Sequence, residues 1–113
     1  MAEHIKIRPA QGTWVVRAGG AVLAESSNAL ELLEGEYPPV IYFPRGDIGM
    51  EFLERTGSAT TCPWKGQASY YAIHAESGVI ADAAWSYETP LKGVEAIGGY
   101  LAFYSNKVTV EQL

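Results

Sequence analysis

Cysteine and histidine are scarce in this sequence of 113 residues, which contains Cys62, His4 and His74 and no other residue of either type. A single cysteine cannot form a disulfide within the chain, so nothing indicates an oxidising compartment. Three such residues are also too few to supply the four ligands of a structural zinc site. The sequence therefore predicts neither a metal site nor a bound cofactor.

Long apolar runs and clusters of positive charge are missing as well. No window approaches the roughly 20 apolar residues of a membrane-spanning helix, and the N-terminus lacks the apolar stretch of a signal peptide. The 8 lysines and arginines are scattered singly and the net charge is -5, which disfavours a nonspecific nucleic-acid binder. We expect a cytoplasmic protein that binds neither membranes nor nucleic acid.

The residue types that are plentiful favour β structure. The chain has 12 Gly and 6 Pro, and its aromatic residues are 3 Trp, 7 Tyr and 3 Phe. Aromatic side chains are enriched in strands, whereas Gly and Pro are typical of turns. An apolar content of 48% is enough for one core in a chain of this length. We therefore expect one domain over residues 1–113, all-β or mostly β.

Alternation of apolar and polar residues predicts about eight short strands. Residues 5–9 alternate cleanly, and residues 13–26 are typical of a hairpin that turns at a Gly-Gly pair. Residues 28–34 fit either a capped helix or a strand, and we favour the strand. Residues 69–87 form a second hairpin pattern. The predicted fold is a single compact antiparallel sheet folded into a barrel or sandwich, with one or two helical turns.

Two local predictions follow from these patterns. Asp47 is placed to cap a helical turn that carries Ile48 and Phe52 inward, together with the leucine that follows. In the second hairpin, strict alternation places Trp85 on the opposite strand face from Asp82. We interpret Trp85 as a core residue rather than a stacking platform.

Three blocks of the sequence together resemble a known family: YFPRGDI (42–48), TCPWKGQASYY (61–71) and DAAWSYETP (82–90). With the first hairpin and the tail IGGYLAFYSNKV, the chain is similar over nearly its whole length to the domain of unknown function 427 family. The resemblance implies a small, mostly β bacterial domain, sometimes labelled as a nucleotidyltransferase type. The family's usual Pro-Arg-Glu-Asp turn is Pro-Arg-Gly-Asp here, so one acid of that turn is missing.

The residues themselves give nucleotidyl transfer little support. That reaction requires metal ions held by closely spaced carboxylates. The chain has two aspartates, Asp47 and Asp82, which are far apart in the sequence. A phosphate-binding loop of the type Gly-x-x-x-x-Gly-Lys-Ser/Thr is absent too.

Cys62 and Asp82 are the candidate catalytic residues. A reactive thiol requires a lowered pKa, from a nearby cation for example, and Lys65 lies three residues after Cys62. We nevertheless favour a packing role for this cysteine, because free cysteines are most often buried. Asp82 lies in a small, apolar run, and we interpret it as a partly buried acid whose partner is Lys65 or Arg45.

The loops 43–47 and 61–66 and the strand around residue 82 are expected to converge on one pocket. Our leading hypothesis is a domain that binds a small ligand there, an anion being one option, with lysine and arginine as donors. The alternatives are an enzyme and a structural or oligomerisation module. The sequence is also compatible with a homo-oligomer. The predicted ligand-binding residues are Arg45, Asp47, Lys65, Tyr42, Trp64 and Tyr70.

Overall fold

A computed structural model describes residues 4–113, and this part of the chain is built almost entirely from β-strands. The strands are β1 Ile5–Pro9, β2 Trp14–Ala18, β3 Ala21–Ser26, β4 Leu30–Glu34, β5 Val40–Tyr42, β6 Leu53–Cys62, β7 Gly66–Ala75, β8 Gly78–Ser86, β9 Leu101–Phe103 and β10 Thr109–Gln112. Three short 3-10 helices, η1 Arg45–Asp47, η2 Met50–Phe52 and η3 Glu95–Ile97, complete the structure. The mostly β prediction is confirmed. None of the described helices is long and apolar enough to cross a membrane.

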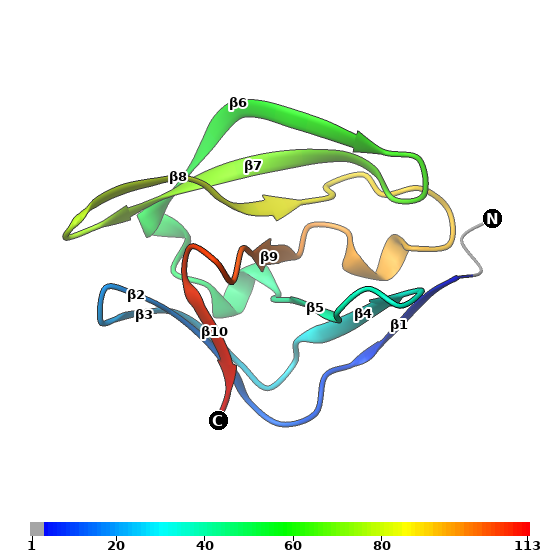
Figure 1. Ribbon diagram of the computed structural model, residues 1–113, viewed down its shortest axis with the longest axis horizontal. Helices are drawn as coiled ribbons and strands as arrows, with labels where there is room; N and C mark the ends of the chain where they lie inside the picture. Colours follow the sequence, from blue (N-terminus) through cyan, green and yellow to red (C-terminus); the bar gives the residue numbers. More distant parts are fainter. Residues whose placement is uncertain (1–3) are drawn as a thin grey trace.

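The strands form three antiparallel sheets rather than one. Their orders are β1-β4-β5, β10-β2-β3 and β6-β7-β8-β9. Figure 1 shows the four-stranded sheet above the two smaller sheets, with β9 facing β5 and β10. The arrangement is sandwich-like and not a closed barrel. A single β-bridge between Phe43 and Leu101 joins the end of β5 to β9, and so links the upper and lower layers.

The two predicted hairpins are confirmed, and their turns are local. Gly19 and Gly20 connect β2 to β3 with φ angles of 56° and 88°, the positive values that a two-residue hairpin turn requires. Glu76 and Ser77 connect β7 to β8, whose ends pair between Ala75 and Gly78. Residues 30–34 form the strand β4, as the favoured interpretation of that segment predicts.

The core consists of two clusters of buried side chains that share β5. Phe43, which directly follows β5, is fully buried in the first cluster, together with Ile73 and Leu101. Tyr42 points the other way and is buried in the second cluster, which also contains Leu32. The strand therefore supplies apolar side chains to both of its faces, as a strand covered on two sides must.

The predicted helical cap at Asp47 is wrong. Two separate 3-10 helices of three residues replace the single helical turn, and neither has a side-chain cap. The Asp47 carboxylate instead accepts a hydrogen bond of 2.6 Å from the hydroxyl of Ser26 on β3. Ile48 is buried as expected, but Phe52 is 45% exposed.

The predicted strict alternation along β8 is also wrong, because the strand is interrupted at Asp82. This residue has a φ of 47°, the single positive value among the described residues other than glycine. The register with β7 changes here, so that residues 81–83 of β8 lie opposite one residue of β7. The alternation is interrupted only at the bulge, where Ala83 and Ala84 are both buried. Two extra residues preserve the alternation beyond it, so Ile80 and Ala84 both face the first core cluster.

Candidate functional site

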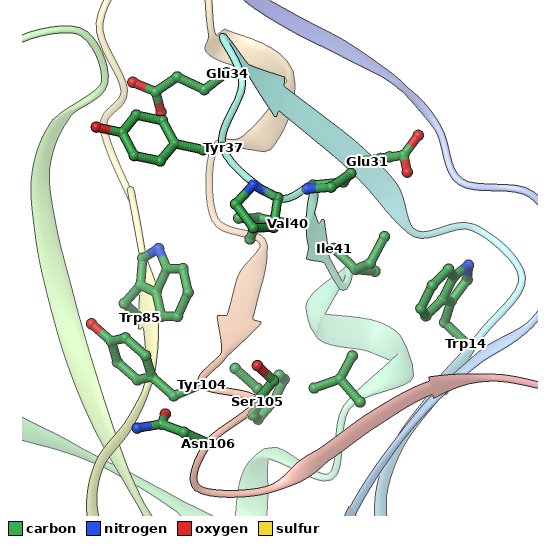
Figure 2. Close-up of a pocket in the computed structure, with 14 residues that line it drawn as sticks. Trp14, Glu31, Glu34, Tyr37, Val40, Ile41, Trp85, Tyr104, Ser105 and Asn106 are labelled. Atoms are coloured by element: carbon green, nitrogen blue, oxygen red, sulfur yellow. The ribbon is translucent and has the colours of Figure 1, made fainter.

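A cleft of about 850 Å³ lies between the lower strands β4 and β5 and the upper strands β8 and β9 (Figure 2). This volume is in the range of small-molecule sites. Five aromatic residues line the cleft, namely Trp14, Tyr37, Trp85, Phe103 and Tyr104. Its polar lining residues are Glu31, Glu34, Ser105 and Asn106, and the remainder are prolines, valines and an isoleucine.

Short, constrained segments carry the walls of the cleft. On the lower side, the backbone of Tyr37 donates to the carbonyl of Glu34, and Pro38 and Pro39 then fix the φ angles of the chain leading into β5. On the upper side, a turn follows β9, in which the amide of Lys107 donates to the carbonyl of Tyr104. Turns next to regular strands, fixed by backbone hydrogen bonds and prolines, thus hold both walls in place.

Trp85 and Tyr104 form a fixed aromatic pair on the upper wall. Their ring centroids are 4.5 Å apart and their planes are inclined at 42°. The indole of Trp85 donates a hydrogen bond of 3.2 Å to the hydroxyl of Tyr42, and the Tyr104 hydroxyl lies 3.5 Å from that of Tyr70. Burial, reinforced by the Tyr70 hydroxyl, raises the pKa of Tyr104 to about 12. The pair is therefore uncharged, and Tyr42 and Tyr70, which do not line the cleft, hold it in place.

Glu34 stands at one end of the cleft beside Tyr37 (Figure 2). Its carboxylate accepts a hydrogen bond of 2.6 Å from Lys65, whose side chain is only 11% exposed. His4 lies 3.5 Å from its other oxygen. The Lys65 ammonium also lies 5.8 Å from the ring centroid of Tyr87. Because Lys65 does not line the cleft, the Glu34 carboxylate is held by a residue outside it.

A separate polar cluster surrounds Glu88, at the end of β8. The Glu88 carboxylate accepts hydrogen bonds from Arg45, from the hydroxyl of Tyr71 at 2.9 Å and from that of Ser69 at 3.2 Å. Burial by itself would raise the pKa of Glu88. The hydrogen bonds from Tyr71 and Ser69, together with the charge of Arg45, outweigh that effect and hold the pKa below its usual value.

The model of the domain of unknown function 427 family matches residues 6–112, which is nearly the whole chain. The chain belongs to this family. No curated protein matches the sequence. The family description assigns no function, so any function has to be inferred from the site itself.

Arg45 and Lys65, which belong to two of the blocks that resemble the family, bind different partners from each other. Arg45 donates to the carbonyl of Gly99 and to Glu88, rather than pairing with Asp47. Lys65 binds Glu34, and Leu91 donates its amide to the Lys65 carbonyl. Each of these contacts ties a family block to a distant segment, which gives the block a structural role.

Asp82 does not pair with Lys65 or Arg45, contrary to the sequence-based interpretation. Its carboxylate accepts two hydrogen bonds of 2.7 Å, from the hydroxyls of Thr56 and Ser58. These two bonds, from Ser58 first and Thr56 second, lower the pKa of Asp82. Among the described residues, no group of three or more His, Cys, Asp or Glu side chains is placed to hold a metal ion.

Cys62 and Trp64 lie at the turn between β6 and β7. Cys62 is half-buried, packs against the second core cluster and is a free thiol. Trp64 is 42% exposed and meets the ring of His4 edge-on at 4.9 Å. The predicted packing role for the cysteine agrees with this position.

None of the six residues predicted to bind a ligand lines the cleft. Three of them touch its lining from behind: Tyr42 through Trp85, Lys65 through Glu34, and Tyr70 through Tyr104. Direct contact of the six with a ligand stays a prediction.

Sequence reasoning missed the cleft because its walls come from segments that read as ordinary turns. Tyr37 precedes two prolines, and Ser105 and Asn106 follow β9, in a composition typical of any surface loop. Trp85, which the sequence predicts to be a core residue, is half-buried: it packs against the second core cluster and also lines the cleft. The one available signal was the gathering of aromatic residues next to these turns.

Proposed function

We propose that this domain is a binding module that holds a small molecule in the cleft between β4-β5 and β8-β9. The fixed pair of Trp85 and Tyr104 supports this function most directly. It presents two aromatic rings to a cleft of about 850 Å³. Large aromatic surface in a concave site, with few polar groups around it, is the usual form of a small-molecule site.

The lining favours a ligand that is not an anion. Glu31 and Glu34 are the charged residues among the fourteen that line the cleft, and no lysine or arginine is among them. The two cations expected to bind an anion, Arg45 and Lys65, are engaged by Glu88 and Glu34 respectively. A neutral or positively charged ligand with an apolar face therefore suits this cleft better than a phosphate or carboxylate.

A fragment screen followed by ¹H–¹⁵N NMR tests this function. We expect fragments to shift the amide signals of Val40, Ile41 and Trp85 and those of residues 103–106. Shifts confined to Arg45, Lys65 and the loop 61–66 would instead support the site predicted from the sequence. No binding of any fragment at millimolar concentration would contradict a small-molecule function.

Tyr37→Ala provides a matched test of the cleft, because Tyr37 is 74% exposed and its loss should not affect folding. An aromatic contact contributes roughly 0.5–1.5 kcal/mol, so we expect fragment affinity to fall about two- to tenfold. Trp64→Ala removes another exposed aromatic residue outside the cleft and should leave the affinity unchanged. Equal effects of the two substitutions would count against this cleft.

A further inference from the structure

We propose that the occupant of this cleft is a small quaternary ammonium ion, of the size of choline, a step that rests on the binding function proposed above. Its positively charged head would lie between Trp85 and Tyr37, toward the carboxylate of Glu34, with Tyr104 packed against Trp85. Figure 2 shows these four residues in sequence along one side of the cleft, with Glu34 and Tyr37 at one end, then Trp85, then Tyr104.

The aromatic rings supply the first part of the argument. The face of an aromatic ring is negative, and a cation within about 6 Å of the ring centre is attracted to it, most strongly by tryptophan. Trp85 and Tyr104 are inclined at 42° with their centroids 4.5 Å apart. Tyr37 lies between Glu34 and Trp85 in Figure 2. A cation held between Tyr37 and Trp85 would have an aromatic ring on either side.

The charged residues of the cleft lining also favour a cation. Glu34 and Glu31 put negative charge on the cleft surface, and no lining residue is positive. Each glutamate pairs with a cation, Lys65 for Glu34 and Arg8 for Glu31, and neither cation is among the residues that line the cleft. The net charge of -5 acts in the same direction at longer range. The aromatic rings and the carboxylates thus both favour a positively charged ligand.

The existing contacts of Glu34 favour a quaternary over a primary ammonium ion. Its Oε1 atom already accepts a hydrogen bond of 2.6 Å from Lys65, and His4 lies 3.5 Å from its Oε2 atom, so both oxygens that a primary ammonium group would bind already face a nitrogen of the protein. A quaternary ammonium ion has no N–H to donate. It is attracted by the charge of Glu34 and by the rings without displacing Lys65, and its methyl groups fit an apolar lining.

The direct test compares choline with 3,3-dimethylbutan-1-ol, which has the same shape with carbon in place of the charged nitrogen. We expect choline to bind the wild-type protein at least about tenfold more tightly in a calorimetric or NMR titration, with shifts at Trp85 and residues 103–106. Equal affinities, or tighter binding of the neutral alcohol, would overturn the cation while leaving the cleft as a binding site. Tighter binding of ethylammonium than of choline would overturn the quaternary preference.

Failure of this inference and failure of the binding function are distinguishable. If neutral fragments bind the cleft and choline does not, the ammonium ligand is wrong and the binding function stands. If neither choline nor any fragment binds, both are wrong. Choline binding that shifts amides elsewhere, with Trp85 unaffected, would also overturn the assignment.

Charge-neutral variants separate electrostatic attraction from fit. Glu34→Gln keeps the shape of the side chain and leaves Lys65 an oxygen acceptor, so choline affinity should fall severalfold while that of the alcohol stays the same. Glu31→Gln is the second variant, since its exposed partner Arg8 makes misfolding a small risk. Glu54→Gln removes an exposed carboxylate that pairs with His74 outside the cleft, and should change neither affinity. Equal losses of choline affinity in all three variants would contradict a local role of the cleft carboxylates.

Discussion

Four side chains converge on the carboxylate of Glu88, and they come from distant parts of the chain. Arg45 belongs to η1, Arg55 to β6, and Ser69 and Tyr71 to β7. Exposed ion pairs contribute little to stability, but this carboxylate is only 30% exposed and also accepts two neutral hydrogen bonds. Glu88 thus acts at the residue scale as a connection between segments.

Lowering the pH should release this connection. The pKa of Glu88 is lower in the folded protein than its ordinary value of 4.5, so ionised Glu88 stabilises the fold above about pH 4.5. That stabilisation is lost as the pH falls through the lowered pKa, because a protonated carboxyl has no charge to attract Arg45 and is a weaker hydrogen-bond acceptor. We expect the melting temperature of Glu88→Gln to be lower than that of the wild type at pH 7, and the difference to shrink toward pH 3. Circular dichroism melts across this range measure it, and a constant difference would contradict the assignment.

At the scale of elements, two neighbouring irregularities are connected across β7. The register of β6 with β7 changes between Arg55 and Ala59, and that of β8 with β7 changes around Asp82. The Asp82 carboxylate accepts hydrogen bonds from Thr56 and Ser58, which lie in the β6 irregularity. Each bulge therefore supports the other, with the middle of β7 between them.

Substitution of Asp82 should separate its two contributions. Asp82→Gly loses the two hydrogen bonds but adopts the φ of 47° without strain. Asp82→Ala loses the same bonds and also keeps a Cβ in the left-handed region, which is unfavourable. We expect both variants to melt below the wild type, and the alanine variant to melt a few degrees below the glycine variant. Equal melting temperatures would show that the backbone at this position is not strained.

This part of the sheet also marks where sequence reasoning stops. Gly19 and Gly20 made the first hairpin predictable, because the turn depends on the two residues themselves. The bulge at Asp82 depends on hydroxyls of another strand, more than twenty residues earlier in the sequence. No local pattern carries that information, so the interruption of the alternation at the bulge could not be foreseen.

At the scale of the whole molecule, Lys65 and Glu34 join the layers at one end of the cleft. Glu34 ends β4 in a lower sheet, and Lys65 lies in the turn between β6 and β7 of the upper sheet. Lys65 is among the residues that the sequence predicts to bind a ligand. Its partner could not be foreseen, because the two residues are 31 positions apart.

Removal of Lys65 should therefore affect stability and not only ligand binding. Lys65→Met keeps the length of the side chain but leaves Glu34 without its main partner, which we expect to cost about 1–3 kcal/mol. Arg17→Met is the matched control, because Arg17 pairs with Glu111 where both side chains are exposed, and it should cost less than about 1 kcal/mol. Denaturant unfolding gives both values. A Lys65→Met variant as stable as the wild type would favour a ligand contact as the main role of this lysine.

The bridge between Phe43 and Leu101 bears on how the protein unfolds. The two residues exchange backbone hydrogen bonds of 2.7 and 3.0 Å, and both are fully buried. Because Phe43 and its neighbour Tyr42 pack into different core clusters, neither cluster can open without disturbing this bridge. We therefore expect the two clusters to unfold as one cooperative unit, and the amide protons of Phe43 and Leu101 to exchange with solvent only when the whole molecule unfolds, as native-state hydrogen exchange would measure.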